Sequence, residues 1–184
     1  MIKILVTGRP GIGKTTVVKK VAKMCSDIGL KVGGMITYEM REGGRRVGFK
    51  VVDILTNREG ILAKVGFGGR YRIGKYIVDL NDLEEVGVGA IKRALAEADL
   101  IIIDEIGPME LFSEEFNRIV REAFNSEKPV VATIHIRADR YPLCREIKRL
   151  PNVKVYVTNY SNRNALPKII FNDLMNWFQL KESQ

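Results

Sequence analysis

The fold of this chain is decided by one short stretch, Gly8-Arg9-Pro10-Gly11-Ile12-Gly13-Lys14-Thr15. It matches the phosphate-binding pattern G-x-x-x-x-G-K-[ST] at every position. Glycines let such a loop point its backbone N–H groups at phosphate oxygens, and the helix that follows adds the positive end of its dipole. Lys14 is expected to reach the β- and γ-phosphates of a nucleotide, and the Thr15 hydroxyl is expected to ligate magnesium. The stretch therefore predicts a P-loop, with a plain glycine turn and a solvated lysine as the alternative.

The residues on either side of this loop have the strand and helix patterns that it requires. Residues 3–7 form a short β-branched run, which is typical of a buried strand. After the loop, Gly29 is placed to end a helix, because apolar residues recur at helical spacing up to that point. This apolar face consists of Val17, Val18, Val21, Cys25 and Ile28.

The rest of the chain alternates predicted strands with predicted helices. Further strands are expected at 100–104, 129–135 and 153–158, and helices at 83–98, after Ser113, at 141–150 and after Pro167. Two strand-like runs, 35–40 and 47–54, are joined by Glu42-Gly43-Gly44, which predicts a hairpin. We therefore expect one α/β domain over residues 1–184, with three layers: a mostly parallel sheet, helices on both of its faces, and an inserted β-hairpin.

Two acids, Asp104 and Glu105, end the apolar run at 100–103. The carboxyl end of a strand is where open α/β sheets bind their ligands. Asp104 is expected to hold magnesium, directly or through water, and Glu105 to polarise an attacking water as general base. The alternative is that these two acids merely follow a strand and have no role in the site. A phosphate loop earlier in the sequence makes this alternative the less favoured one.

The sequence thus predicts a complete nucleotide site. Its catalytic residues are expected to be Glu105 and Lys14, and its magnesium ligands Thr15 and Asp104. The residues expected to bind the nucleotide are Gly8, Arg9, Pro10, Gly11, Ile12, Gly13, Lys14, Thr15, Thr16, Asp104 and Glu105.

Several segments carry a resemblance to one known family. They are the loop at 8–15, Ile103-Asp104-Glu105-Ile106-Gly107-Pro108-Met109-Glu110-Leu111, Val131-Ala132-Thr133-Ile134-His135, Thr37-Tyr38-Glu39, Arg46-Val47-Gly48-Phe49 and Arg72-Ile73-Gly74-Lys75-Tyr76. Through them the chain resembles the small thermophile-type nucleoside-triphosphatase family over most of its length. The resemblance implies a RecA-like core, dependence on Mg²⁺, and hydrolysis of ATP, GTP and other triphosphates (CTP and UTP included) with little regard for the base. Consistently, residues 158–161 lack the lysine and the acid of the guanine-recognition signature of switch GTPases.

Secondary positions near the predicted strand ends have two interpretations each. Thr133 and His135 could touch the γ-phosphate or the attacking water, while His135, the one histidine, could equally be structural. Arg137 or Arg140 could neutralise charge in the transition state, and a partner protein could also supply that positive charge. Arginines that follow each other closely in the sequence are, however, more often part of a solvated helix face.

Composition and charge restrict the remaining possibilities. With 30 basic and 22 acidic residues the net charge is +8, which favours anionic partners. Two alternative functions stay open: a P-loop kinase for a small-molecule acceptor, and a nucleotide-switched RNA-binding protein. Because the basic residues are dispersed along the sequence, a nucleic acid is not the favoured binding partner. The apolar runs are too short to cross a membrane, and we expect a cytoplasmic monomer. Cys25 and Cys144 form neither a zinc motif nor a disulfide framework.

Overall fold

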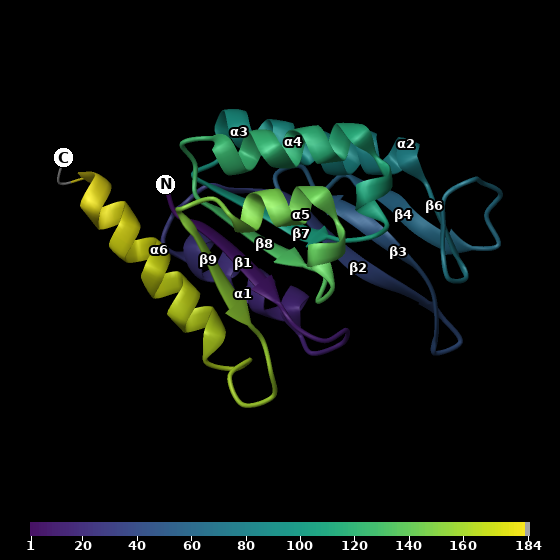
Figure 1. Cartoon of the computed structure of the whole chain (residues 1–184), viewed down its shortest axis with the longest axis horizontal. Coiled ribbons are helices and arrows are strands. Elements are labelled where there is room, and N and C mark those ends of the chain that lie inside the picture. The colour runs from purple at the N-terminus through teal and green to yellow at the C-terminus, as the bar shows by residue number, and fades with distance from the viewer. Residues whose placement is uncertain (183–184) are drawn as a thin grey trace.

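The apolar runs of the sequence assemble into one mixed sheet, seen in a computed structural model that describes residues 1–182 (Figure 1). Within these residues the sheet has nine strands, in the order β5-β6-β4-β3-β2-β7-β8-β1-β9. The strands are β1 (Lys3–Thr7), β2 (Val32–Glu42), β3 (Arg45–Asp53), β4 (Glu59–Val65), β5 (Arg72–Ile73), β6 (Tyr76–Val78), β7 (Leu100–Ile106), β8 (Val130–Ile134) and β9 (Val153–Val157).

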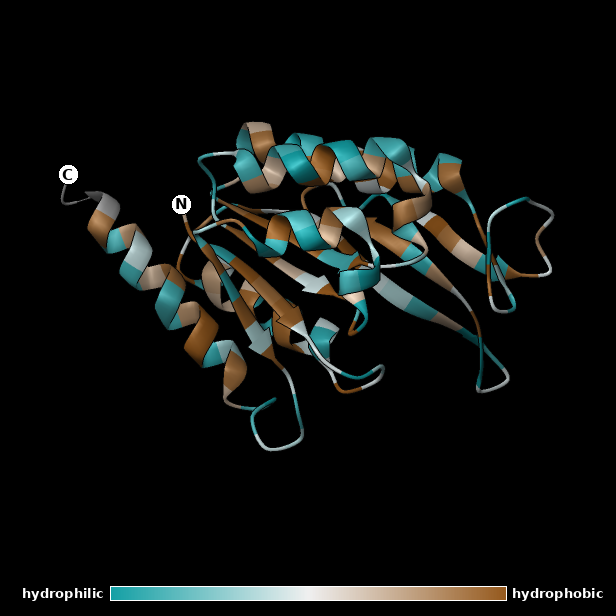
Figure 2. Ribbon diagram, in the orientation of Figure 1, coloured by the Kyte–Doolittle hydropathy of each residue, from teal (hydrophilic) through white to brown (hydrophobic). Residues whose placement is uncertain are grey.

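The strands β2, β7, β8, β1 and β9 pair in parallel and form one side of the sheet, with β9 at its edge. Successive side chains of a strand point to opposite faces, so Leu5, Ile101 and Ile103 pack on one side, and Ile4 and Ile102 on the other. Each face is covered by helices, which confirms the expected three layers (Figures 1 and 2). One layer consists of α1 (Lys14–Asp27) and α6 (Leu166–Glu182), and the other of α3 (Gly89–Glu97), α4 (Glu114–Asn125) and α5 (Pro142–Lys148).

The antiparallel part of the sheet is larger than the single hairpin that the sequence predicts. The strand β2 pairs in parallel with β7 through residues 32–35 and antiparallel with β3 through residues 35–42. The expected turn is present: Gly43 and Gly44 both have positive φ, 55° and 78°, as a tight primed hairpin turn requires. The sheet then continues through β4, β6 and β5, and the last two strands form a short second hairpin that the sequence did not predict.

The helix expected at 83–98 begins earlier, at Leu80. It is continuous from α2 (Leu80–Asp82) through a π-helical turn (Leu83–Val88) into α3. A Cβ at Gly87 would lie 3.2 Å from the Met35 sulfur and 3.4 Å from a Val51 methyl. Gly87 therefore serves the close approach of this helix to the sheet.

The predicted cap at Ser113 is confirmed, but two residues expected on apolar helix faces are exposed: Ile28, which follows the end of α1 and is 55% exposed, and Ile169 in α6. The Ser113 hydroxyl accepts a hydrogen bond from the Phe116 N–H at 3.0 Å and caps α4, whose predicted apolar face is buried. In α6, Leu166, Ile170 and Leu174 are buried, but Ile169 is 44% exposed, so it lies outside the core face. Among the described residues, no helix is both long and apolar enough to cross a membrane.

Candidate active site

The predicted phosphate loop connects the end of β1 to the start of α1, as its sequence requires. Gly13 is the N-cap residue of α1 with φ 109°, a backbone conformation that suits glycine. Gly8 has φ 150°, and a Cβ there would lie 2.6 Å from the Thr158 carbonyl oxygen. The Lys14 side chain is buried, and its Nζ donates to the Gly8 carbonyl at 3.2 Å. Close packing of the loop therefore requires Gly8, whereas the left-handed backbone conformation favours glycine at Gly13.

Asp104 lies near the carboxyl end of β7 and is held by hydroxyl groups from three different elements. Thr15 donates to its carboxylate at 3.0 Å, Thr37 at 3.1 Å and Thr133 at 2.7 Å. The carboxylate is almost completely buried. These bonds fix its orientation beside Thr15, so the two predicted magnesium ligands are brought together.

Two of these threonines have roles that the sequence did not reveal. Thr133, which we expected to touch the γ-phosphate or the attacking water, is fully buried and donates to Asp104 instead. Thr37 belongs to a segment that carries the family resemblance but was given no role, although it lies just beyond the segment of β2 that pairs in parallel with β7. Because parallel strands end at the same edge, a threonine at that position was a usable signal.

Glu105 follows Asp104 through a cis peptide bond and is half-buried. Burial raises the pKa of its carboxyl above the ordinary value, and the nearby Lys14 ammonium partly opposes this shift. A carboxylate whose pKa moves toward neutrality is better suited to accept a proton than an exposed one. Its position allows proton transfer from a group that attacks a phosphate held by Lys14.

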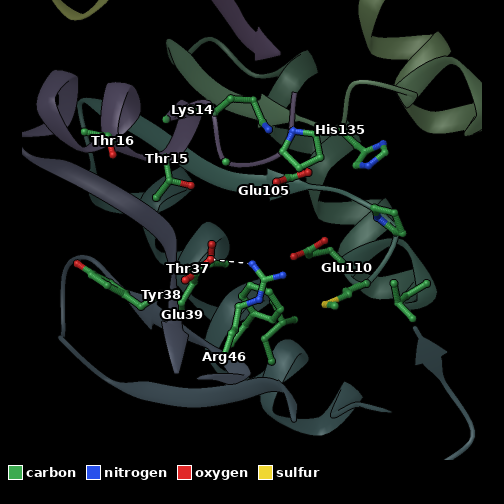
Figure 3. A pocket seen from close by; sticks show the side chains of 18 of the residues that line it. Lys14, Thr15, Thr16, Thr37, Tyr38, Glu39, Arg46, Glu105, Glu110 and His135 are labelled. Atoms are coloured by element: carbon green, nitrogen blue, oxygen red, sulfur yellow. Dashed lines mark hydrogen bonds and ion pairs between the residues drawn. The ribbon is translucent and has the colours of Figure 1, made fainter. Parts of the chain in front are cut away.

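A cavity of about 530 Å³ joins the phosphate loop to the hairpin of β2 and β3 (Figure 3). Of the predicted site residues, the described lining contains Pro10, Gly11, Gly13, Lys14, Thr15, Thr16 and Glu105. Gly8, Arg9, Ile12 and Asp104 are not part of that lining; Ile12 and Asp104 are buried, whereas Arg9 is exposed. The lining residues that sequence reasoning missed are Lys19, Thr37, Tyr38, Glu39, Arg46, Phe49, Leu62, Ile73, Pro108, Met109 and Glu110.

His135 lines the same cavity, and its ring is oriented by the backbone. Its Nδ1 accepts the Arg137 N–H at 3.1 Å. Burial lowers the pKa of the imidazole, and the positive charges of Lys14, Arg137 and Arg140 lower it further. A neutral His135 then carries its proton on Nε2 and can act as a hydrogen-bond donor. Arg137 and Arg140 themselves are exposed and are absent from the described lining of the cavity.

The oxygen atoms of Thr15 and Asp104 suit a small divalent cation. Mg²⁺ prefers hard oxygen ligands and is usually held by one or two protein groups together with substrate phosphates and water. Residues 1–182 contain no group of three or more His, Cys, Asp or Glu side chains placed to hold a metal ion. The donor set of one carboxylate and one hydroxyl therefore fits Mg²⁺ that arrives with a nucleotide. Cys25 and Cys144 are buried free thiols, and burial raises the pKa of both to about 11.

Comparisons with known proteins agree with this geometry. The sequence profile of a family described as "NTPase" matches residues 3–171. A nucleoside-triphosphatase THEP1 from Thermofilum pendens is 56% identical over 163 residues, which cover 89% of this chain and 90% of that protein.

Solved structures give the same result. The crystal structure of THEP1 from the hyperthermophile Aquifex aeolicus superposes with a TM-score of 0.81 at 36% identity, covering 92% of this chain and 96% of the other. The solution structure of a human cancer-related nucleoside triphosphatase has a TM-score of 0.81 at 34% identity, with coverage of 96% and 98%. With its P-loop, a central strand that carries Asp104 and Glu105 near its carboxyl end, and these relatives, the chain belongs to the NTPase family and is a nucleoside-triphosphate hydrolase.

Proposed function

We propose that this enzyme removes the terminal phosphate of ATP, GTP, CTP and UTP with Mg²⁺ as cofactor and with little discrimination between bases. One observation supports the proposal above others: Thr15, which lines the cavity together with Lys14 and Glu105, donates a hydrogen bond to the buried Asp104 carboxylate at 3.0 Å. The arrangement supports a role for Lys14 as the phosphate-binding cation, for Thr15 and Asp104 as the metal-binding pair, and for Glu105 as the base. Those are the parts that phosphoryl transfer needs.

In this proposal each side chain has one task. Lys14 binds the β- and γ-phosphates, and the N–H groups of the loop residues hold the phosphate oxygens. Thr15 and Asp104 hold Mg²⁺, which, when bound, neutralises charge on the phosphate oxygens. Glu105 accepts a proton from the water whose oxygen attacks the γ-phosphorus, while the bond from that phosphorus to the β–γ bridging oxygen breaks. His135 donates a hydrogen bond to the γ-phosphate or to the water.

Weak base selectivity is supported by the loop that follows β9. A side-chain amide is the group that would read the edge of a base, and Asn159 is the nearest one in the region of the guanine signature. Its Oδ1 already accepts from the Ser161 N–H at 2.9 Å, the Ser161 hydroxyl at 2.6 Å and the Asn162 N–H at 3.0 Å. Asn159 is therefore engaged in its own turn.

The experiment compares Glu105→Gln with the wild type. We measure phosphate release from the four triphosphates, with and without Mg²⁺, and nucleotide affinity by equilibrium binding. Glu105→Gln is expected to keep nucleotide binding and to lower kcat by about two to four orders of magnitude, because it removes the base but keeps the shape. Glu114→Gln, an exposed acid in the first turn of α4, is the matched control and should keep full activity.

Wild-type turnover in Glu105→Gln would remove that residue from the mechanism. Activity confined to one base, or unchanged by removal of Mg²⁺, would overturn the corresponding part of the proposal. The organisation of residues 1–184 as one domain, the monomeric state and the cytoplasmic location stay predictions.

A further inference from the structure

The cavity extends well beyond the phosphate loop. Its second part, which we name the outer chamber, lies between the β2–β3 hairpin and the segment that follows β7 (Figure 3). The chamber is lined by Arg46, Phe49, Leu62, Ile73, Met109 and Glu110. A volume of about 530 Å³ for the whole cavity falls in the range of pockets that hold an organic ligand. A water molecule as the attacking group does not require this space.

The chamber has an apolar wall. Leu62 is 2% exposed, and the Phe49 ring packs edge-on against Tyr76 with centroids 5.2 Å apart. Met109 and Ile73 are half-buried and complete the lining. Apolar and aromatic surface of this kind gains free energy by covering the carbon body of a ligand. It contributes nothing to the binding of a lone water or a phosphate.

Arg46 adds a fixed positive charge to this wall. Its Nε donates to the Tyr76 hydroxyl at 3.0 Å, and its Nη1 donates to Glu39 at 2.8 Å, while the guanidinium lies 5.1 Å from the Phe49 ring centroid. Glu39 also accepts from Arg41 at 2.6 Å, so its one negative charge is shared by two guanidinium groups. The cluster keeps a net positive charge, and Arg46 has further N–H groups that can bind a carboxylate or phosphate.

The position of the chamber relative to Glu105 indicates what it binds. In Figure 3, Lys14 and Arg46 lie on opposite sides of the cavity, and the Glu105 and Glu110 carboxylates lie between them. A ligand beside Arg46 therefore lies on the Glu105 side of Lys14, which is the side from which the nucleophile enters in the proposed function. Glu110 is 5% exposed at this junction, and burial, reinforced by the negative charge of Glu105, holds the pKa of its carboxyl well above the ordinary value. A protonated Glu110 can donate a hydrogen bond to a ligand oxygen.

We propose that the outer chamber is an acceptor site for a small alcohol with an apolar ring and one carboxylate or phosphate group, and that the enzyme also transfers the γ-phosphoryl group to this alcohol. The inference rests on the proposed function, since it uses the same phosphate site and base. The alcohol oxygen forms a bond to the γ-phosphorus, and the bond to the β–γ bridging oxygen breaks, which releases the nucleoside diphosphate. The hydroxyl proton passes to Glu105 and then to solvent. The ring packs on Phe49 and Leu62, and Arg46 binds the anionic group.

The test uses γ-³²P-labelled ATP with Mg²⁺ and two defined probes, 4-(hydroxymethyl)benzoate and 4-(hydroxymethyl)cyclohexanecarboxylate. Labelled phosphate ester is separated from inorganic phosphate by anion exchange. Both probes should acquire label, whereas 4-methylbenzoate, which lacks the hydroxyl, should only compete with them. Benzyl alcohol, which lacks the anionic group, should be phosphorylated at least about tenfold less efficiently, because a charge-assisted bidentate contact is lost.

Two arginine variants separate the acceptor site from the hydrolytic site. Arg46→Gln should raise the KM for the carboxylate probes at least about tenfold and leave hydrolysis without probe unchanged. Arg41→Gln is the matched control: it bonds to the same Glu39 but does not belong to the described lining of the cavity, so both activities should persist.

Each failure has a distinct meaning. If the wild type hydrolyses ATP but labels neither probe, the acceptor site is refuted and the proposed function stands. If Arg46→Gln loses hydrolysis to the same extent as transfer, Arg46 serves the γ-phosphate and the assignment of the chamber is overturned. If the wild type releases no phosphate at all, with or without a probe, the proposed function fails first.

Discussion

Replacement of Thr133 by valine should destabilise the protein, although the two side chains have almost the same shape. The Thr133 hydroxyl is fully buried and donates to the Asp104 carboxylate at 2.7 Å. A hydrogen bond to a charged group contributes about 1.5–3 kcal/mol, and no water can replace a donor at a site without exposure. We therefore expect the free energy of unfolding to fall by about 2–3 kcal/mol. In a chain of this size that corresponds to a decrease of roughly 4–12 °C in Tm.

The chain offers a matched control at Thr158. Its hydroxyl is also buried, but it has no hydrogen-bond partner within the described part of the chain. Thr158→Val removes an unsatisfied polar group, so the free energy of unfolding should stay constant or rise by up to about 2 kcal/mol. Both variants are measured by equilibrium unfolding in guanidinium chloride. Equal free energies of unfolding for the two variants would refute the reasoning.

Activity gives a second measurement of the same contact. Thr133 is a positioning residue because it acts through Asp104, a proposed ligand of Mg²⁺. Loss of a group that orients a metal ligand typically weakens metal affinity about 10–100-fold. Thr133→Val should therefore raise the Mg²⁺ concentration for half-maximal activity by that factor, and Thr158→Val should leave it unchanged. A lower kcat in Thr133→Val without any change in the Mg²⁺ requirement would contradict this role.

Three further predictions follow from buried groups of the structure. Lys3→Met should lower the free energy of unfolding, measured in guanidinium chloride, by at least about 2 kcal/mol. The reason is that the Lys3 ammonium donates to the carbonyls of Ala123 at 2.8 Å, Ser126 at 2.9 Å and Lys128 at 2.5 Å. An unchanged free energy of unfolding would mean that water can satisfy these carbonyls. Glu110→Gln should become progressively more stable than the wild type as pH rises from about 4.5 toward alkaline values, and the difference in Tm measures this effect. The negative charges of Glu105 and Asp104 face Glu110. A carboxyl whose pKa is raised in the folded state loses its stabilising contribution as pH passes through that value, whereas glutamine does not titrate. A difference in Tm that does not vary with pH would show that Glu110 is not forced to ionise in the folded state. Gly8→Ala should impair nucleotide binding and stability together, since its Cβ would lie 2.6 Å from the Thr158 carbonyl oxygen, and wild-type affinity would contradict that packing.

The parts of the site that could be predicted depend on neighbours in the sequence. The spacing of Gly8, Gly13 and Lys14 is a local geometric requirement, and the structure places it between a strand and a helix as expected. The apolar run before Asp104 forms a central strand because a strand buried on both faces needs no alternation of polar and apolar residues. Ser113 caps α4 because its hydroxyl and the Phe116 N–H are only three residues apart.

The antiparallel extension of the sheet was only partly predictable. The hairpin turn at Gly43 and Gly44 is a strong local signal, and it was confirmed. The strands β5 and β6 are only two and three residues long, which is too short for any periodicity to appear. The Ile73 side chain on β5 reaches the cavity only because β6 pairs with β4 and places this second hairpin at the edge of the sheet.

The sequence by itself determined the phosphate loop, the acid-ended strand, the helix caps and the three-layer class, because each follows from spacing within a few residues or from a local period of polarity. Only the tertiary structure decided that Thr37 and Thr133 hold Asp104, and that Lys3 is buried under the end of α4 rather than exposed. It also decided that Arg46 and Glu110 line the cavity of Glu105. These contacts join residues far apart in the chain, and they depend on the order of strands in the sheet. Alternation of polar and apolar residues states which face of a strand is buried, but it does not state which strand lies beside it.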